Sequence, residues 1–167
     1  MERLSNKYLD VQNELKIELS SIKLNSNQYC AVKYMEIPWF PGGQVALFLV
    51  ADKSIEHYYK LIEKTWDSEY DSGRFSTGVF NLDRLCIRER EIQMTIDNQK
   101  ECQDIIHNLL FFPKKIERQD YILLDGVEYE LQITTNSVKK NYKWKIASDD
   151  IKYFERLIAF MKRIAQG

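Results

Sequence analysis

The side chains best suited to acid–base or nucleophilic chemistry are the two histidines and the three cysteines. His57 has Glu56 beside it, but adjacent residues of the helix expected there point in different directions. Cys102 and His107 are five positions apart in a second expected helix, a spacing that spreads them around the helix. A cysteine nucleophile with a histidine base would therefore need tertiary contacts to form. A structural or surface role is the simpler interpretation of each histidine.

Three carboxylates at alternate positions, Asp67, Glu69 and Asp71, resemble the start of a calcium-binding loop. An EF-hand loop that began at Asp67 would need glycine at its sixth position and glutamate at its twelfth. The sequence has Ser72 and Gly78 at those positions, so we predict no metal site. We interpret the three residues as an acidic loop, which is either simply solvated or docks against a basic partner.

A second candidate surface is the segment 38–43, in which two prolines and two glycines surround Trp39 and Phe40. The prolines and glycines exclude regular structure there. Either the two aromatic rings fold back over the core, or they form an exposed anchor for a partner, with the prolines lowering the entropy lost on binding. Gly42 and Gly43 precede a strand and lack the following Lys-Ser/Thr pair, so they do not form a phosphate-binding loop.

Lysines alternate with aromatic residues near the C-terminus, a pattern also typical of strips that bind single-stranded nucleic acid. In a strand, however, the aromatic and the lysine side chains face opposite sides. Glu128 and Glu130 would neutralise the lysine side, so nucleic-acid binding is only the second alternative to the function favoured below. The residues of this pattern are Lys139, Lys140, Tyr142, Lys143, Trp144 and Lys145.

Composition narrows the class of protein further. The 167 residues suit one domain with an ordinary core, and the net charge of −1 gives no general attraction for DNA or anionic membranes. The three cysteines are odd in number and widely spaced, which indicates a reducing compartment. The N-terminus lacks a signal-peptide core, and the longest apolar run, Val45 to Ala51, is too short to span a bilayer. We therefore expect a cytoplasmic protein with no membrane partner.

The most regular pattern of the chain lies in residues 121–165. Asp125-Gly126, between alternating apolar residues, predicts a tight turn between two strands. A loop at 136–141 then leads to a third strand, with Tyr142, Trp144 and Ile146 on one face. The expected register pairs apolar with apolar and acidic with basic side chains. Its pairs are Leu131 with Trp144, Tyr129 with Ile146, and Glu130 with Lys145.

An amphipathic helix follows this third strand. Ser148 is the expected N-cap, and Asp149 and Asp150 place negative charge at the positive end of the helix dipole. The apolar stripe can be buried only against the neighbouring strands, so we expect the helix to lie across the sheet. The stripe consists of Ile151, Phe154, Ile158, Met161 and Ala165, widened by Leu157 and Ile164.

The first half of the chain gives a less regular pattern. A helix is expected to begin near Leu4, but from Glu14 onward the residues fit either its continuation or, as we slightly favour, a strand. A strand over 29–37 would then close a hairpin. Val45 to Ala51 is expected to be buried on both faces, at the centre of the sheet.

The middle of the chain is expected to alternate between helices and strands. Apolar spacing predicts a helix over 55–66, and the polar stretch 67–77 is typical of a loop. One or two strands are expected within 78–97. Asn98 then caps a further helix, which Pro113 ends. The sum is a single α+β domain over 1–167, with a mostly antiparallel sheet, three or four helices on one face, and the C-terminal helix packed across the sheet.

The sequence contains none of the catalytic or nucleotide-binding motifs sought, so we expect no cofactor and favour a non-enzymatic protein. We expect a binding protein that neutralises or regulates a macromolecular partner. In size and architecture it resembles many bacterial immunity proteins, which neutralise toxins, although no motif of a particular family is present. An acidic surface would suit a basic toxin domain. The expected partner-binding residues are Trp39, Phe40, Asp67, Glu69 and Asp71.

The first alternative is an enzyme or sensor for a small molecule. It would place a deep cleft between the sheet and the helices, with His57, Glu56 or His107 converging on it.

Overall fold

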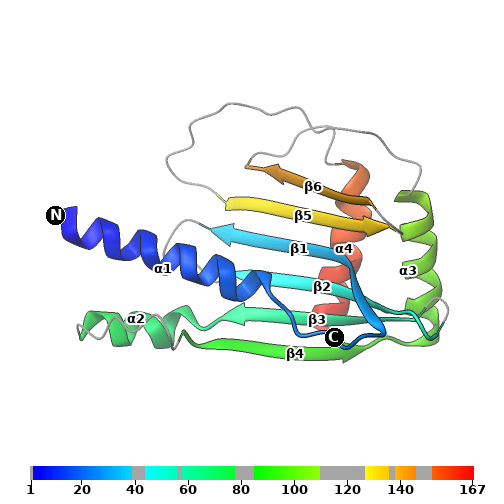
Figure 1. Cartoon of the computed structure of the whole chain (residues 1–167), viewed down its shortest axis with the longest axis horizontal. Coiled ribbons are helices and arrows are strands. Elements are labelled where there is room, and N and C mark those ends of the chain that lie inside the picture. The colour runs from blue at the N-terminus through cyan, green and yellow to red at the C-terminus, as the bar shows by residue number, and fades with distance from the viewer. Residues whose placement is uncertain are drawn as a thin grey trace.

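The computed structural model describes residues 2–38, 44–55, 58–77, 85–109, 127–135, 138–145 and 152–167, with only the backbone for residues 2–8 and 135. Over these residues the chain forms four helices and one antiparallel sheet of six strands, the α+β architecture expected (Figure 1). In chain order the elements are α1 (Glu2–Ser20), β1 (Gln28–Pro38), β2 (Val45–Asp52), β3 (Tyr59–Trp66), α2 (Ser68–Ser76), β4 (Ile87–Gln93), α3 (Ile96–Leu109), β5 (Val127–Thr135), β6 (Val138–Trp144) and α4 (Lys152–Gln166).

The sheet has the strand order β4-β3-β2-β1-β5-β6, with every neighbouring pair antiparallel. The two central strands are β1 and β2, which confirms the expected position of the apolar run at 45–51. Side chains of β2 alternate between two separate apolar clusters. Leu47 and Leu49 belong to one cluster, and Phe48 and Val50 belong to the other.

Helices cover both faces of the sheet, so the expectation of helices on one face was wrong. Figure 1 shows α1 and α4 on opposite sides of the strands. On one face α1 packs over β1, β2 and β3, and on the other α4 packs over β2 and β3 with α3 beside it. The reason lies in β2, whose apolar side chains on both faces must be shielded from water.

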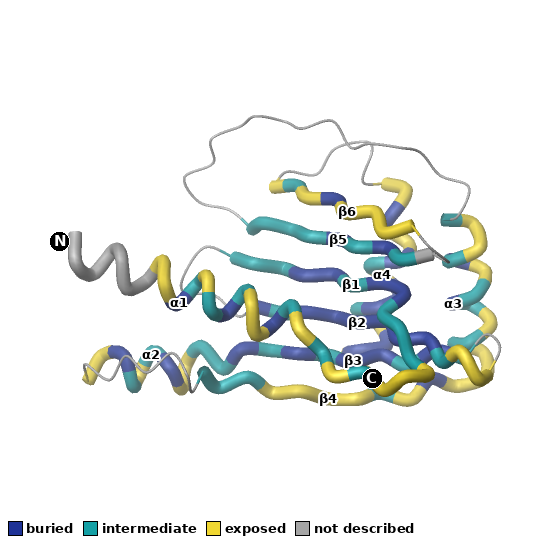
Figure 2. The backbone as a smooth tube through the Cα atoms, in the orientation of Figure 1, coloured by how far each residue is buried: buried dark blue, intermediate teal, exposed yellow. Residues whose placement is uncertain are grey.

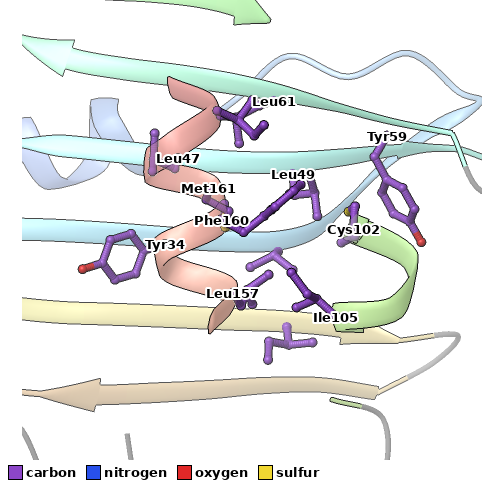
Figure 3. Packing of buried hydrophobic residues seen from close by; sticks show 14 of the residues in the cluster. Tyr34, Leu47, Leu49, Tyr59, Leu61, Cys102, Ile105, Leu157, Phe160 and Met161 are labelled. Carbon is purple, nitrogen blue, oxygen red and sulfur yellow. The ribbon is translucent and has the colours of Figure 1, made fainter. Parts of the chain in front are cut away.

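The C-terminal helix α4 packs against the sheet as predicted. Figure 3 shows Leu157, Phe160 and Met161 pointing onto the strands beside Leu47 and Leu49. All five side chains are at most 2% exposed. The predicted stripe differed in two members, because Phe160 is buried and Ile158 only partly so.

The preferred change from helix to strand near Glu14 was wrong, since α1 continues to Ser20. Val11, Leu15 and Leu19 are four residues apart and fully buried, whereas Ile17 is 60% exposed. Helical periodicity therefore decides the local structure, and the apparent alternation around Ile17 does not.

The secondary structure expected for 55–66, a helix, and for 67–77, a loop, was wrong. Residues 59–66 form strand β3, which pairs with β2 on one edge and with β4 on the other. Lys60 and Lys64 form ion pairs with Glu91 and Glu89 of β4. The expected loop is the helix α2. Farther on, α3 begins at Ile96 and not after Asn98, whose backbone N–H donates to Thr95 Oγ1 at 3.2 Å.

The hairpin of β5 and β6 keeps the predicted faces but shifts the register by two residues. Tyr129 is opposite Trp144, Leu131 is opposite Tyr142, and Glu130 is opposite Lys143. The shift arises because β6 already begins at Val138, so the connection is shorter than the loop expected over 136–141. The expected turn at 125–126 and the expected helix cap at 148–150 lie outside the described residues.

Replacing Leu157 with alanine tests the packing of α4. The cavity left under this fully buried side chain should lower the free energy of unfolding by about 2–5 kcal/mol, measured by urea denaturation. Ile17→Ala is the matched control, because Ile17 is mostly exposed and its truncation should change that free energy by at most about 0.5 kcal/mol. Equal losses from the two substitutions would contradict the packing described here.

Candidate functional site

Asp71 is a buried structural carboxylate at the end of the sheet. Its side chain is fully shielded from solvent. Trp66 Nε1 and the backbone N–H of Cys86 both donate to Oδ2 at 2.8 Å, and Arg74 Nη1 donates to Oδ1 at 2.7 Å. One carboxylate thus joins β3, α2 and the residues that precede β4. Because it is buried, Asp71 cannot itself touch a partner docked on this folded surface.

Asp67 occupies the N-cap position of α2. The backbone N–H of Tyr70 donates to Asp67 Oδ1 at 3.1 Å, and Arg88 of β4 donates to Oδ2. The backbone N–H of Asp67 also donates to the carbonyl oxygen of Cys86 at 2.8 Å. An aspartate cap followed by acidic residues in the first turn is a typical helix start, and this signal was available in the sequence.

Glu69 and Tyr70 point outward from the first turn of α2. Both residues are exposed, and Tyr70 is 59% exposed. The Arg74 guanidinium lies 5.8 Å from the centre of the Tyr70 ring, one helical turn away. Of the three carboxylates named from the sequence, Glu69 is therefore the most accessible.

A hollow of about 350 Å³ lies beside this first turn. A volume of this size can admit a small ligand or a side chain of a partner protein. Two carboxylates, two hydroxyls and a guanidinium face it, so its chemistry suits hydrogen bonding to a polar or charged group. Its lining residues are Thr65, Trp66, Asp67, Ser68, Glu69 and Arg88. The sequence pattern does not single out Thr65, Ser68 or Arg88. Arg88 comes beside Thr65 only through the pairing of β3 with β4.

Trp39 and Phe40 lie outside the described residues, but the residues that flank their segment are placed. Pro38 ends β1 opposite Val127, and the Gln44 carbonyl oxygen accepts from the Trp66 backbone N–H at 3.0 Å. Both segments named from the sequence are thus attached to the same end of the sheet.

Three aromatic rings, Tyr34 of β1, Tyr129 of β5 and Trp144 of β6, form a triangle in which each ring lies 5.6 to 6.5 Å from the other two. The rings of Tyr129 and Trp144 have centroids 5.6 Å apart and planes inclined by 15°, and Tyr34 follows at 6.5 Å from Tyr129. Tyr34 is buried, whereas Tyr129 and Trp144 are half-buried. Because these rings belong to the face that α4 packs on, they point away from Lys139 and Lys143 of β6, whereas Lys140 is on their own face.

The thiols lie in surroundings that disfavour nucleophilic chemistry. Cys102 belongs to the core beside Tyr59 and Ile105 (Figure 3), and burial raises its pKa to about 12. Burial likewise raises the pKa of Cys30 to about 11, against a smaller opposite effect of nearby lysines. His107 lies on the exposed side of α3, and the side chains of residues 56–57 are outside the described set.

Within the described ranges, no group of three histidine, cysteine or acidic side chains is arranged to hold a metal ion. Among the helices that the structure describes, none has both the length and the apolar character needed to cross a membrane. Comparison of the chain with protein-family models, curated proteins and solved structures finds no match.

Asp71→Asn tests the structural role of the buried carboxylate. The substitution removes the buried negative charge that pairs with Arg74 and one acceptor oxygen, so the free energy of unfolding should fall by about 2–4 kcal/mol. Glu69→Gln, two residues away but exposed, should change it by at most about 0.5 kcal/mol. Chemical denaturation of both variants measures the difference, and an Asp71→Asn protein as stable as Glu69→Gln would refute the assignment.

The Cys102 thiol should resist alkylation in the folded protein, because burial both blocks access and keeps the thiol protonated. Iodoacetamide labelling at neutral pH, followed by mass spectrometry, should modify Cys102 at least about 100-fold more slowly than in urea. Rapid labelling of Cys102 in the folded protein would contradict this prediction and would indicate a reactive cysteine.

Proposed function

We propose that this chain is a non-enzymatic binding protein that neutralises or regulates a macromolecular partner, as bacterial immunity proteins do with toxins. The docking surface is the sheet end formed by the first turn of α2, the hollow beside it and the segment containing Trp39 and Phe40. One observation carries the proposal: the buried Asp71 network fixes the turn from which Glu69 and Tyr70 project.

A surface fixed in this way supports binding because little conformational entropy is lost when a partner docks. Asp67 caps the helix and Asp71 anchors it to β3 and to the residues before β4, so the backbone beneath Glu69 is already ordered. Binding energy is then not spent on ordering the loop. A tyrosine held on such a turn is a typical interface residue, since its ring offers contact area with few rotatable bonds.

The chemistry of the surface favours a partner with exposed lysine or arginine side chains. Glu69 offers a carboxylate at the rim of the hollow, and Asp67 offers a second one that exposed Arg88 now occupies. A cation of the partner can approach Glu69 directly, or can replace Arg88 at Asp67. Complementary charge at the rim of an interface chiefly raises the association rate and selects the partner. A basic toxin domain has this chemistry.

Trp39 and Phe40 supply the apolar part of the proposed surface. Their segment is attached at Pro38 and at Gln44, and the Gln44 backbone is hydrogen-bonded to Trp66, one of the residues that line the hollow. The topology therefore allows one partner to contact the aromatic segment and α2 together. Large aromatic residues commonly carry much of the energy of an interface.

Glu69→Gln tests the proposed surface once the partner has been recovered by co-purification from source cells and then purified. The substitution should weaken the complex about 5- to 30-fold, mainly through slower association at low salt. Glu155→Gln is the matched control, because Glu155 is likewise an exposed glutamate in the first turn of a helix, α4. Surface plasmon resonance gives both rates. If the two variants bind as tightly as the unmodified chain, the partner docks elsewhere.

A ligand sensor is the alternative that the hollow itself favours, since its volume and polar lining suit a small charged molecule. Arg88→Gln would then abolish a thermal shift produced by that molecule, while a protein partner would still bind through Glu69 and Tyr70. Of the histidines expected in such a cleft, His107 is not among the lining residues, and His57 lies outside the described residues.

A further inference from the structure

A second surface lies on the sheet face that carries α1, where β5 and β6 extend beyond that helix. It is formed by Lys33 of β1, Gln132 and Thr134 of β5, and Lys139, Asn141 and Lys143 of β6, and is called the lysine face below. The register places Lys33 beside Gln132, and Gln132 beside Asn141. Figure 2 shows β6 exposed along most of its length.

Among the residues that the structure describes on this face, positive charge exceeds negative charge. The Glu130 carboxylate lies 2.7 Å from Lys143 Nζ and 2.5 Å from Lys16 Nζ of α1, and Glu128 lies 3.0 Å from the same Lys16 atom. These ion pairs lower the pKa of Glu130 to about 2, although its burial acts in the opposite direction. At this end of the face, the charges of Lys16 and Lys143 are thus balanced by those of Glu128 and Glu130.

Farther along the face, two lysines have no acidic side chain within ion-pair distance among the described residues, and Glu130 acts on Lys33 only from a longer distance. Within the described part of the chain, neither Lys33 nor Lys139 forms an ion pair. Burial lowers the pKa of Lys33, with Glu130 opposing the change and repulsion from Lys139 and Lys143 adding to it. An anion placed between these lysines would relieve their repulsion, and the side-chain amides of Gln132 and Asn141 lie between them to donate hydrogen bonds.

We propose that the lysine face is a docking site for an acidic segment of a partner protein, whose carboxylates bind at Lys33 and Lys139. This surface is distinct from the proposed docking surface at α2 and does not depend on it. The residues between the lysines offer amide and hydroxyl groups, which suit the carboxylates and backbone of a peptide.

The same geometry disfavours a nucleic acid as the occupant. Single-stranded nucleic acids bind where bases can stack on aromatic rings beside a basic groove. Here Tyr142 and Trp144 point to the opposite face, where Tyr142 packs on Phe154 with ring centroids 4.7 Å apart. The lysines are therefore separated from every ring on β6, and a peptide with alternating carboxylates matches them better.

The test measures binding of a fluorescein-labelled oligo-glutamate peptide to the whole chain by fluorescence anisotropy. The unmodified chain should bind the peptide with an affinity that falls with salt, and Lys33→Gln/Lys139→Gln should weaken it about tenfold. Lys53→Gln/Lys100→Gln is the matched control, because it removes the same charge from two exposed lysines elsewhere and should bind as the unmodified chain does.

Two outcomes would overturn the proposal. One is equal weakening in the two double variants, which would mean that the peptide binds through the net charge of the protein and not at this face. The other is tighter binding of a labelled oligo-deoxythymidine that is lost in Lys33→Gln/Lys139→Gln, which would make this a nucleic-acid surface. Lys139→Gln alone, at an exposed strand position, should weaken peptide binding about threefold, so the result does not depend on substituting half-buried Lys33.

Discussion

The burial of β2 on both faces is the constraint on which the rest of the structure depends. Six of its eight residues are buried, with side chains alternating between the two sides of the sheet. A strand of this kind needs neighbouring strands on both edges and helices on both faces. The neighbouring strands are β1 and β3, and the helices are α1 on one face and α3 with α4 on the other.

Buried charged groups then fix the helices in place. Lys64 is 8% exposed, and its Nζ donates to the carbonyl oxygens of Glu18 at 3.2 Å and Ser21 at 2.7 Å. A cation there satisfies unpaired carbonyls and interacts favourably with the negative end of the helix dipole. Asp71 plays the corresponding part for α2, with Trp66, Arg74 and Cys86 as donors. Each group is buried only because several partners surround it, so removing one partner affects a whole helix.

The sequence predicted the parts of the fold whose pattern is local and long. The α+β class, the central strand at 45–51, the hairpin strands at the C-terminus and the packing of α4 all follow from side-chain periodicity. The same rule failed over 55–66, because Tyr59, Ile62 and Trp66 fit a helical stripe, while the buried pairs that this segment forms with β2 decide for a strand. It also could not show that Asp71 is buried, since that depends on Cys86, fifteen residues away. The sequence likewise could not show that Arg88 lines the hollow, because that depends on the pairing of β3 with β4.

Coverage by the helices determines which surfaces remain for binding. On the face under α1 the apolar side chains end at β1, where Met35 is fully buried, and the next strand outward carries Glu128, Glu130 and Gln132. The helix α1 therefore covers this face only as far as β1, where the sheet becomes polar. At that edge Lys16 of α1 forms ion pairs with Glu128 and Glu130 of β5. At the end of the sheet, the buried carboxylate of Asp71 anchors α2, and Glu69 on the outer side of the helix faces solvent. The lysine face is formed mainly by the side chains of β5 and β6 that the core does not use, and the α2 surface by the outer side of a helix whose inner carboxylate is buried. At both surfaces the core has already ordered the backbone beneath the exposed side chains.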